Sequence, residues 1–295
     1  LMATVQNTMP RQAWLQAALH IHPGEGRLVA LLVALYFALA GAFVFVQSMA
    51  FGVFLTEFGP QGLPYSYVAI AILASLVAVL YLKLSERVSF PALLTINLSC
   101  LGVGCVVFWL GLTSGAAREF AFFLPLWFQI VINLGNLAVW PLAGRLFDVR
   151  QGKRLFGLVG AGNWLANVMG GFLVPPLVAW LGTTNLLLLA AGSLGAALII
   201  LRVIVGSYLG HPAPAAQHRA PTRKPKAGPS LLRNRYVVLI FGYTLLWWVT
   251  FFFADNIFFD RAAAQFPDAA QLTSFIGRLL SATGVIALIT TTFLT

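Results

Sequence analysis

The sequence predicts an all-α integral membrane protein, a helical bundle with one complete six-helix half and two helices of a second half. Of the 295 residues, 60% are hydrophobic and only 9% are charged. Soluble domains carry about 25% charged residues, so this chain lacks the charge that a water-facing surface of its size requires. Its apolar residues fall into blocks of helical length, and one long polar break separates the sixth block from the seventh. These observations favour a multi-pass membrane protein.

Eight apolar segments are long enough to cross about 30 Å of hydrocarbon as α-helices, which takes about 20 residues each. They are residues 28–54, 64–83, 91–112, 120–143, 155–181, 185–206, 236–254 and 272–294. They divide the chain into an N-terminal tail, a first half, a linker and the start of a second half, at residues 1–27, 28–206, 207–235 and 236–295. The last segment has no polar exit, so we expect the sequence to be a fragment of a longer protein.

Basic residues indicate the orientation, because cytoplasmic loops of membrane proteins carry an excess of Lys and Arg. With the N-terminus inside, fifteen Lys and Arg residues fall on the cytoplasmic side and only two, Arg118 and Arg261, fall outside. This distribution predicts a cytoplasmic N-terminus. Acidic residues are expected mostly in the outer loops, at Glu57, Glu119, Asp255, Asp260 and Asp268. No Asp or Glu is then expected within a span.

The net charge of +10 resides in loops and in the linker, which is rich in Pro, Ala and basic residues. Such a segment is typical of a flexible linker, and near a membrane each basic residue is attracted to anionic lipid by about 1 kcal/mol. We therefore expect membrane lipids as partners and no nucleic acid. Six spans, a cytoplasmic linker and further spans are the layout of a two-half transporter.

The sequence contains no catalytic signature. Its histidines all lie in the tail or the linker, at His20, His22, His211 and His218. Metal or triad chemistry would need them clustered with carboxylates on a rigid support. We therefore predict no enzyme activity, no metal and no cofactor.

Polar residues inside the spans are the candidates for a solute site, since polar groups in hydrocarbon are costly and face a bundle interior or a cavity. Gln129, Asn133 and Asn136 follow each other at i, i+4 and i+7, so they share one helical face. Hydrogen bonding between helices would explain this face equally well, and both interpretations stay open. The cavity candidates are Gln47, Gln129, Asn133, Asn136, Asn163, Asn167 and Arg278.

The fifth segment carries a stripe of small residues, Gly162, Ala166 and Gly170, with Asn163 and Asn167 beside it. Small residues at this spacing allow a neighbouring helix to approach closely. Arg278, in the eighth segment, has two interpretations: it snorkels to the interface, or it serves an anionic solute or an ion pair.

A short basic loop joins the fourth and fifth segments. We expect Asp148 to accept hydrogen bonds from backbone N–H groups at the start of the next helix, and Lys153 and Arg154 to anchor at anionic headgroups. This loop could act as a latch that ties neighbouring helices in one access state. Simple positive-inside anchoring is the alternative, and it leaves Asp148 unexplained. The latch loop comprises Gly144, Asp148, Arg150, Gly152, Lys153 and Arg154.

Residues 127–173 read WFQIVINLGNLAVWPLAGRLFDVRQGKRLFGLVGAGNWLANVMGGFL, and residues 250–280 read TFFFADNIFFDRAAAQFPDAAQLTSFIGRLL. In both stretches the chain resembles bacterial members of the nucleotide transporter (ATP/ADP translocase) family, which is related to the major facilitator superfamily. The resemblance implies a major-facilitator-like bundle in the bacterial inner membrane. Nucleotide exchangers of that family carry charges in the first span, where this chain has Gln47 and Ser48.

We therefore expect a transporter that moves a small anionic solute, for example a nucleotide, by alternating access. The alternative is a membrane sensor or anchor that does not transport and that carries a cytoplasmic regulatory domain beyond residue 295. The uncharged first span favours this alternative.

Overall fold

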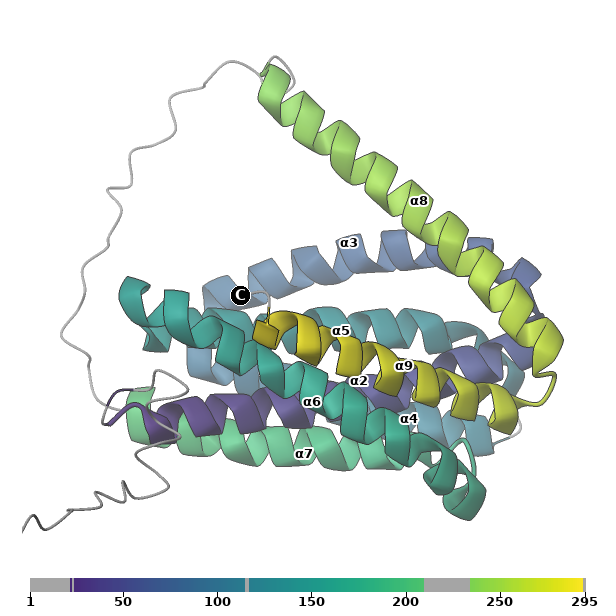
Figure 1. Ribbon diagram of the computed structural model, residues 1–295, viewed down its shortest axis with the longest axis horizontal. Helices are drawn as coiled ribbons and strands as arrows, with labels where there is room; N and C mark the ends of the chain where they lie inside the picture. Colours follow the sequence, from purple (N-terminus) through teal and green to yellow (C-terminus); the bar gives the residue numbers. More distant parts are fainter. Residues whose placement is uncertain (1–21, 23, 115–116, 210–233, 294–295) are drawn as a thin grey trace, which may run out of the picture.

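The structure is a computed structural model that describes residues 22, 24–114, 117–209 and 234–293. These residues form eight long α-helices and no strand (Figure 1). All eight are long and apolar enough to cross a membrane, which bears out the predicted all-α multi-pass membrane protein. They are α2 (Gly26–Phe58), α3 (Leu63–Arg87), α4 (Phe90–Thr113), α5 (Ala117–Leu146), α6 (Val149–Leu181), α7 (Leu186–Ile204), α8 (Arg235–Gln265) and α9 (Ala269–Phe293). Most of the tail and most of the predicted linker lie outside the described residues.

Helix α2 is the centre of the bundle. It packs against α5, α6, α7 and α9, and Figure 1 shows it running through the middle of the molecule. Its large side chains, among them Leu32, Leu39, Met49 and Phe54, are fully buried. A helix that is apolar on all sides is suited to this position, because every face meets another helix.

The small-residue stripe of α6 allows the close helix approach that its spacing predicts, and the helix that it meets is α2. A Cβ atom on Gly162 would lie 2.7 Å from the carbonyl oxygen of Val33, and one on Gly170 would lie 3.3 Å from the side chain of Val44. Ala166 between them is buried. The stripe therefore brings the backbones of α6 and α2 together.

Helix α9, which follows α8 in the chain, packs along α6 and α2. Its backbone approaches α6 so closely that a Cβ atom on Gly171 would collide with the carbonyl oxygen of Gly277. The Ser281 hydroxyl donates a 3.0 Å hydrogen bond to the carbonyl oxygen of Val168. In a regular helix the carbonyl oxygen of Gly171 would accept a hydrogen bond from the backbone N–H of residue 175. Pro175 has no N–H, so this helical hydrogen bond is missing at the contact.

Helix α8 corrects one prediction. It continues to Gln265, well beyond residue 254, so Asp255 and Asp260 are helical and the prediction of a loop at these residues is wrong. Glu57 and Glu119, also predicted in loops, likewise lie in the last turn of α2 and the first turn of α5. Charge alone does not end a helix. The chain leaves the helical conformation at Phe266, where φ is −125° and ψ is 83°, because Pro267 disfavours helix in the residue before it.

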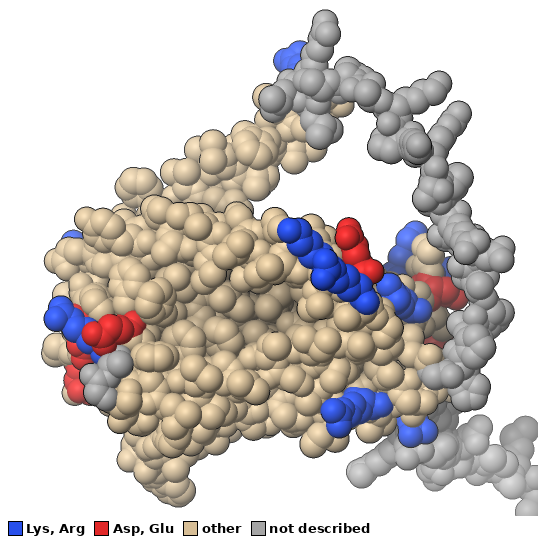
Figure 2. Space-filling model, turned by 180° about the vertical axis from the view of Figure 1, so that it is seen from behind, with Lys and Arg blue, Asp and Glu red and all other residues tan. Residues whose placement is uncertain are grey.

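The charges of the described residues gather toward the two ends of the bundle, and Figure 2 shows a broad uncharged belt between them. We call the end where α2, α4, α6 and α8 begin the basic end, and the other the opposite end. The opposite end has Arg118 and Arg261. Nine of the described Lys and Arg residues lie toward the basic end: Arg27, Lys83, Arg87, Arg145, Arg150, Lys153, Arg154, Arg202 and Arg235.

Candidate functional site

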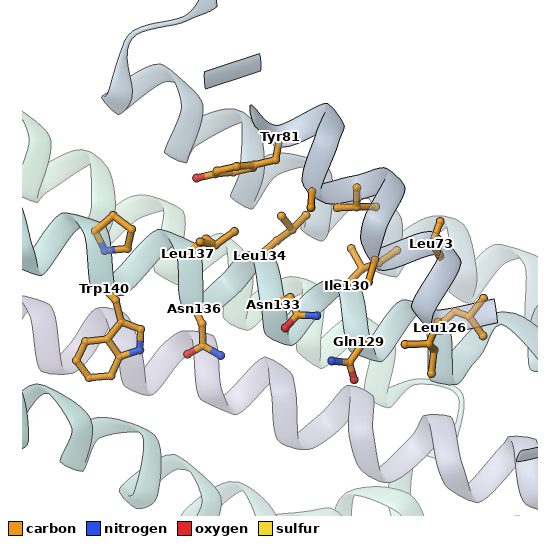
Figure 3. Close-up of a pocket in the computed structure, with 15 residues that line it drawn as sticks. Leu73, Tyr81, Leu126, Gln129, Ile130, Asn133, Leu134, Asn136, Leu137 and Trp140 are labelled. Carbon is orange, nitrogen blue, oxygen red and sulfur yellow. The ribbon is translucent and has the colours of Figure 1, made fainter. Parts of the chain in front are cut away.

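A cavity of about 550 Å³ lies between α3 and α5. This volume lies in the range typical of small-molecule sites, roughly 300–1,000 Å³. Most of its lining is apolar, and its polar members are Gln129, Asn133 and Asn136 of α5 and Tyr81 of α3. Figure 3 shows the three amides in a row along α5 with Tyr81 above them on α3. The structure thus brings the predicted amide face of α5 to one wall of a cavity.

The three amides differ in what holds them. Asn136 accepts a 2.9 Å hydrogen bond from the Tyr36 hydroxyl of α2, and its Nδ2 donates to the carbonyl oxygen of Ile132. Neither Gln129 nor Asn133 makes a side-chain hydrogen bond to any described residue, and Asn133 is exposed to the cavity. The two interpretations of this face therefore apply to different residues: Asn136 connects helices, whereas Gln129 and Asn133 are free to bind a solute.

A backbone carbonyl group, that of Leu137, is a further hydrogen-bond acceptor on the same wall. Pro141 lies inside α5 and lines the cavity, and it has no N–H to donate to the carbonyl oxygen of Leu137. Leu137 also lines the cavity. Backbone groups without helical partners are tolerated at membrane depth where they line a cavity or are buried in protein. Sequence analysis missed this acceptor, although Pro141 within an apolar segment is a visible signal.

The other amide candidates lie elsewhere. Gln47 is half-buried in α2, and Asn163 and Asn167 are half-buried in α6. The Nδ2 group of Asn167 donates a 2.8 Å hydrogen bond to the carbonyl oxygen of Asn163 on its own helix. None of the three lines the cavity between α3 and α5. The structure does not bring them together with the α5 amides.

Arg278 lines a second cavity, of about 370 Å³, between α6 and α9. Gln271, Ser274 and Pro175 also line it. The Arg278 side chain is exposed and forms no ion pair with a described residue. Both interpretations of Arg278, snorkelling and anion binding, remain compatible with this position.

The predicted latch loop is built around the N-terminus of α6. Asp148 is the N-cap and accepts hydrogen bonds from the backbone N–H groups of Arg150 (2.8 Å) and Gln151 (2.7 Å). The Gln151 side chain accepts in turn from the Asp148 N–H at 3.0 Å. This is a capping box, which satisfies N–H groups that a helix start leaves free. Gly144 and Lys153 are exposed, whereas Gly152 is buried.

Arg154 has a partner that sequence analysis missed. It forms a 2.6 Å ion pair with Glu25, which also accepts a 2.9 Å hydrogen bond from the Gln151 side chain. Partial burial raises the pKa of the Glu25 carboxyl, but the hydrogen bonds from Gln151 and the His22 backbone and the charge of Arg154 lower the pKa overall. These contacts join α6 to the start of α2 within the first half. Their visible signal is a single acidic residue directly before the first apolar segment.

The described residues contain no group of three His, Cys, Asp or Glu side chains that could hold a metal ion. Searches against protein-family models, curated proteins and solved structures find no match. The family resemblance of residues 127–173 and 250–280 therefore stays a prediction.

Proposed function

We propose that this protein is a secondary transporter, built on major-facilitator lines, that moves a small polar solute through the membrane by alternating access. The observation that carries the proposal is one wall of the cavity between α3 and α5. This wall, which we call the amide wall, is formed by Gln129, Asn133 and Asn136. Asn133 lies near the middle of α5, which runs from Ala117 to Leu146. Solute sites of secondary transporters lie near the bilayer midplane. A cavity with unpartnered amides at this depth fits that requirement.

The lining of the cavity favours a neutral solute. It contains no Lys, Arg, Asp or Glu, so no charged side chain compensates a solute charge. The amides of Gln129 and Asn133 offer donors and acceptors that match hydroxyl, carbonyl and amide groups. The apolar side chains around them fit a solute with a hydrocarbon part.

An anionic solute, such as the nucleotide that the family resemblance implies, is a second candidate. Arg278 favours it, because an arginine inside a span without an ion-pair partner can compensate a solute charge. This candidate places the anion between α6 and α9, at a site separate from the amide wall. The two candidates therefore predict different essential residues.

Uptake into proteoliposomes tests both candidates. The purified protein is assayed with radiolabelled sugars, amino acids, organic anions and nucleotides. Asn133→Leu is expected to reduce uptake of a neutral solute at least about fivefold, because lost hydrogen bonds to solute cost about 1 kcal/mol or more. Asn163→Leu, a matched change outside the cavity, is expected to leave uptake unchanged. Arg278→Gln is expected to abolish uptake of anions only.

Absence of uptake or exchange of every solute class by the folded protein contradicts transport. That result favours the membrane sensor or anchor, which needs helices but no solute path. Equal uptake by wild type and Asn133→Leu removes the amide wall from the site.

A further inference from the structure

Asp255 lies deeper in the membrane region than the other acidic residues of the chain. All eight Asp and Glu residues belong to the described part of the structure, and the other seven lie at a helix end or within five residues of one. Asp255 lies ten residues before the end of α8 at Gln265. At about 1.5 Å per residue, this places it about 15 Å from the helix end.

The length of α8 shows what this depth means. Its 31 residues extend about 46 Å, which exceeds the hydrocarbon thickness of about 30 Å by about 8 Å at each end. If α8 is centred in the bilayer, Asp255 lies about 7 Å inside the hydrocarbon boundary. An ionisable residue at such a position is costly and indicates a function.

The Asp255 carboxyl has one polar partner among the described residues. The hydroxyl of Tyr67, on α3, donates a 2.8 Å hydrogen bond to its Oδ2. The Tyr67 ring packs on Phe252, one turn before Asp255, with 4.5 Å between ring centroids. No described Lys or Arg forms an ion pair with Asp255. The carboxyl group is therefore half-buried beside aromatic rings without a compensating cation.

Among the described residues, Tyr67 is the one titratable side chain that forms a hydrogen bond or an ion pair with Asp255. Asp260 and Arg261, the next charged residues of α8, lie more than a turn nearer the helix end, and Asp260 lines a separate cavity with Pro60 of the short 3₁₀ helix η1 (Pro60–Gly62). From α2, the uncharged Phe51 stacks its ring on Phe259 of α8, and the uncharged Leu55 and Thr56 share the cavity that Asp260 lines.

The pair of Tyr67 and Asp255 lies where α8 meets the first half. Its hydrogen bond is the one that connects α8 to α3 or α2 among the described residues. Toward the basic end α8 diverges from the bundle, as Figure 1 shows. The contact is therefore placed to control whether α8 closes on α3 at the opposite end.

We propose that Asp255 is the proton-binding site that couples this transporter to a proton gradient, and that protonation of Asp255 closes α8 on α3 at the opposite end. The proposal rests on the proposed transport function. A proton from the adjoining water adds to one carboxylate oxygen and leaves a neutral acid, whose other oxygen accepts the Tyr67 hydrogen bond. Loss of that proton to water restores the carboxylate.

The direction of the response follows from hydration. A carboxylate beside the Phe252 ring loses water that it needs, whereas the neutral acid loses much less. Separation of α8 from α3 admits water to the carboxylate. Low pH therefore favours the closed arrangement of Tyr67 and Asp255, and high pH favours the open one.

The test measures the distance between a spin label on α8 and a second label on α4, both at the opposite end of the bundle. Labels are attached to cysteines introduced at Thr113, the exposed end of α4, and at Gln265, the exposed end of α8. The full chain, with Cys100 and Cys105 replaced by Ser and Ala, is reconstituted in liposomes without any solute. Distances are recorded by double electron–electron resonance from pH 5 to pH 9 at constant Na⁺, and over a range of Na⁺ concentrations at constant pH.

The wild-type distance is expected to shift from a short to a long population as the pH rises. Asp255→Asn is expected to stay in the short population at every pH, because the amide oxygen accepts from Tyr67 and carries no charge. Tyr67→Phe should keep the pH response with a smaller short population. Asp260→Asn, the matched control on the same helix, should respond like the wild type.

A pH response that survives in Asp255→Asn overturns the proposal, as does a response to Na⁺ in place of pH. Infrared spectroscopy provides a second measurement on folded protein: the carbonyl band of a protonated carboxyl should appear at low pH in the wild type and be missing in Asp255→Asn. Neither measurement needs a solute, so the two proposals can fail separately. If the protein takes up solute but shows no pH response, only the proton site is contradicted. If it shows the pH response but takes up no solute, only transport is contradicted.

Discussion

Arg154, near the start of α6, forms a 2.6 Å ion pair with Glu25, the residue directly before α2. The two residues are 129 positions apart in the chain. The side chain of Gln151, in the first turn of α6, donates a hydrogen bond to the same carboxylate. The basic end of the bundle is therefore held by a charged contact between the starts of α2 and α6, in addition to apolar packing.

Replacing Glu25 by Gln is expected to lower the unfolding temperature slightly. The side chains of both partners are only partly exposed, at 16% for Glu25 and 23% for Arg154, yet ion pairs that water can reach contribute at most about 1 kcal/mol. Thermal unfolding in detergent, followed by loss of helical circular dichroism, measures the effect. Glu86→Gln, at an exposed carboxylate on α3, should leave the unfolding temperature unchanged. Equal shifts for both variants would contradict a specific role of the Glu25 contact.

The stabilisation by Glu25 should depend on pH. Because the pKa of Glu25 is lowered in the folded protein, its carboxylate stabilises the fold above the ordinary value of 4.5. This stabilisation is lost as the pH falls through the lower folded value. The difference in unfolding temperature between wild type and Glu25→Gln should therefore be full at pH 7 and shrink as the pH falls below 4.5. A difference that does not change as the pH falls would show that Glu25 acts through packing.

The close approach of α6 and α9 predicts opposite effects for two glycine substitutions. Gly171→Ala places a methyl group against the carbonyl oxygen of Gly277, so the helices must separate. Such overpacking costs about 1–3 kcal/mol. Gly192→Ala, on α7, meets nothing within 4 Å and should stabilise the helix by up to about 1 kcal/mol through propensity. Thermal unfolding in detergent compares them, and a stabilising effect of Gly171→Ala would contradict the contact.

Periodicity explains which parts of the fold and site could be predicted. In lipid every backbone group needs a partner, so long apolar blocks can only be helices, and all eight appear in the structure. The spacing of Gln129, Asn133 and Asn136 likewise indicates a common face, and these residues do share a cavity wall. Spacing does not say which neighbour a face meets. For this reason Asn163 looks equivalent in the sequence but lies outside the cavity.

The pairs between distant segments could not be predicted. Glu25 meets Arg154, and Tyr67 meets Asp255, only because α2 packs beside α6 and α8 crosses the end of α3. No local pattern connects these residues. The depth of Asp255 was missed for a related reason: a charge after an apolar run suggests a membrane boundary, whereas the helix ends where Pro267 disrupts it.

The distribution of Lys and Arg predicts that the basic end faces the cytoplasm. Two exposed sites test this: Ser85, near the basic end of α3, and Thr113, at the opposite end of α4. Each is changed to cysteine in a protein without Cys100 and Cys105 and expressed in intact bacterial cells. A membrane-impermeant maleimide should label Thr113→Cys at once and Ser85→Cys only after the cells are opened.

The reverse pattern would place the basic end outside. Such a result would contradict the positive-inside rule for this chain. It would also mean that protons reach Asp255 from the cytoplasm. Asp255 lies nearer the opposite end, so labelling of Thr113→Cys in intact cells means that protons reach Asp255 from outside the cell. If proton and solute move together, an inward proton gradient drives the solute inward whichever way the protein faces, so the uptake assay imposes an inward gradient. The orientation experiment instead decides from which side of the membrane protons reach Asp255 in the cell.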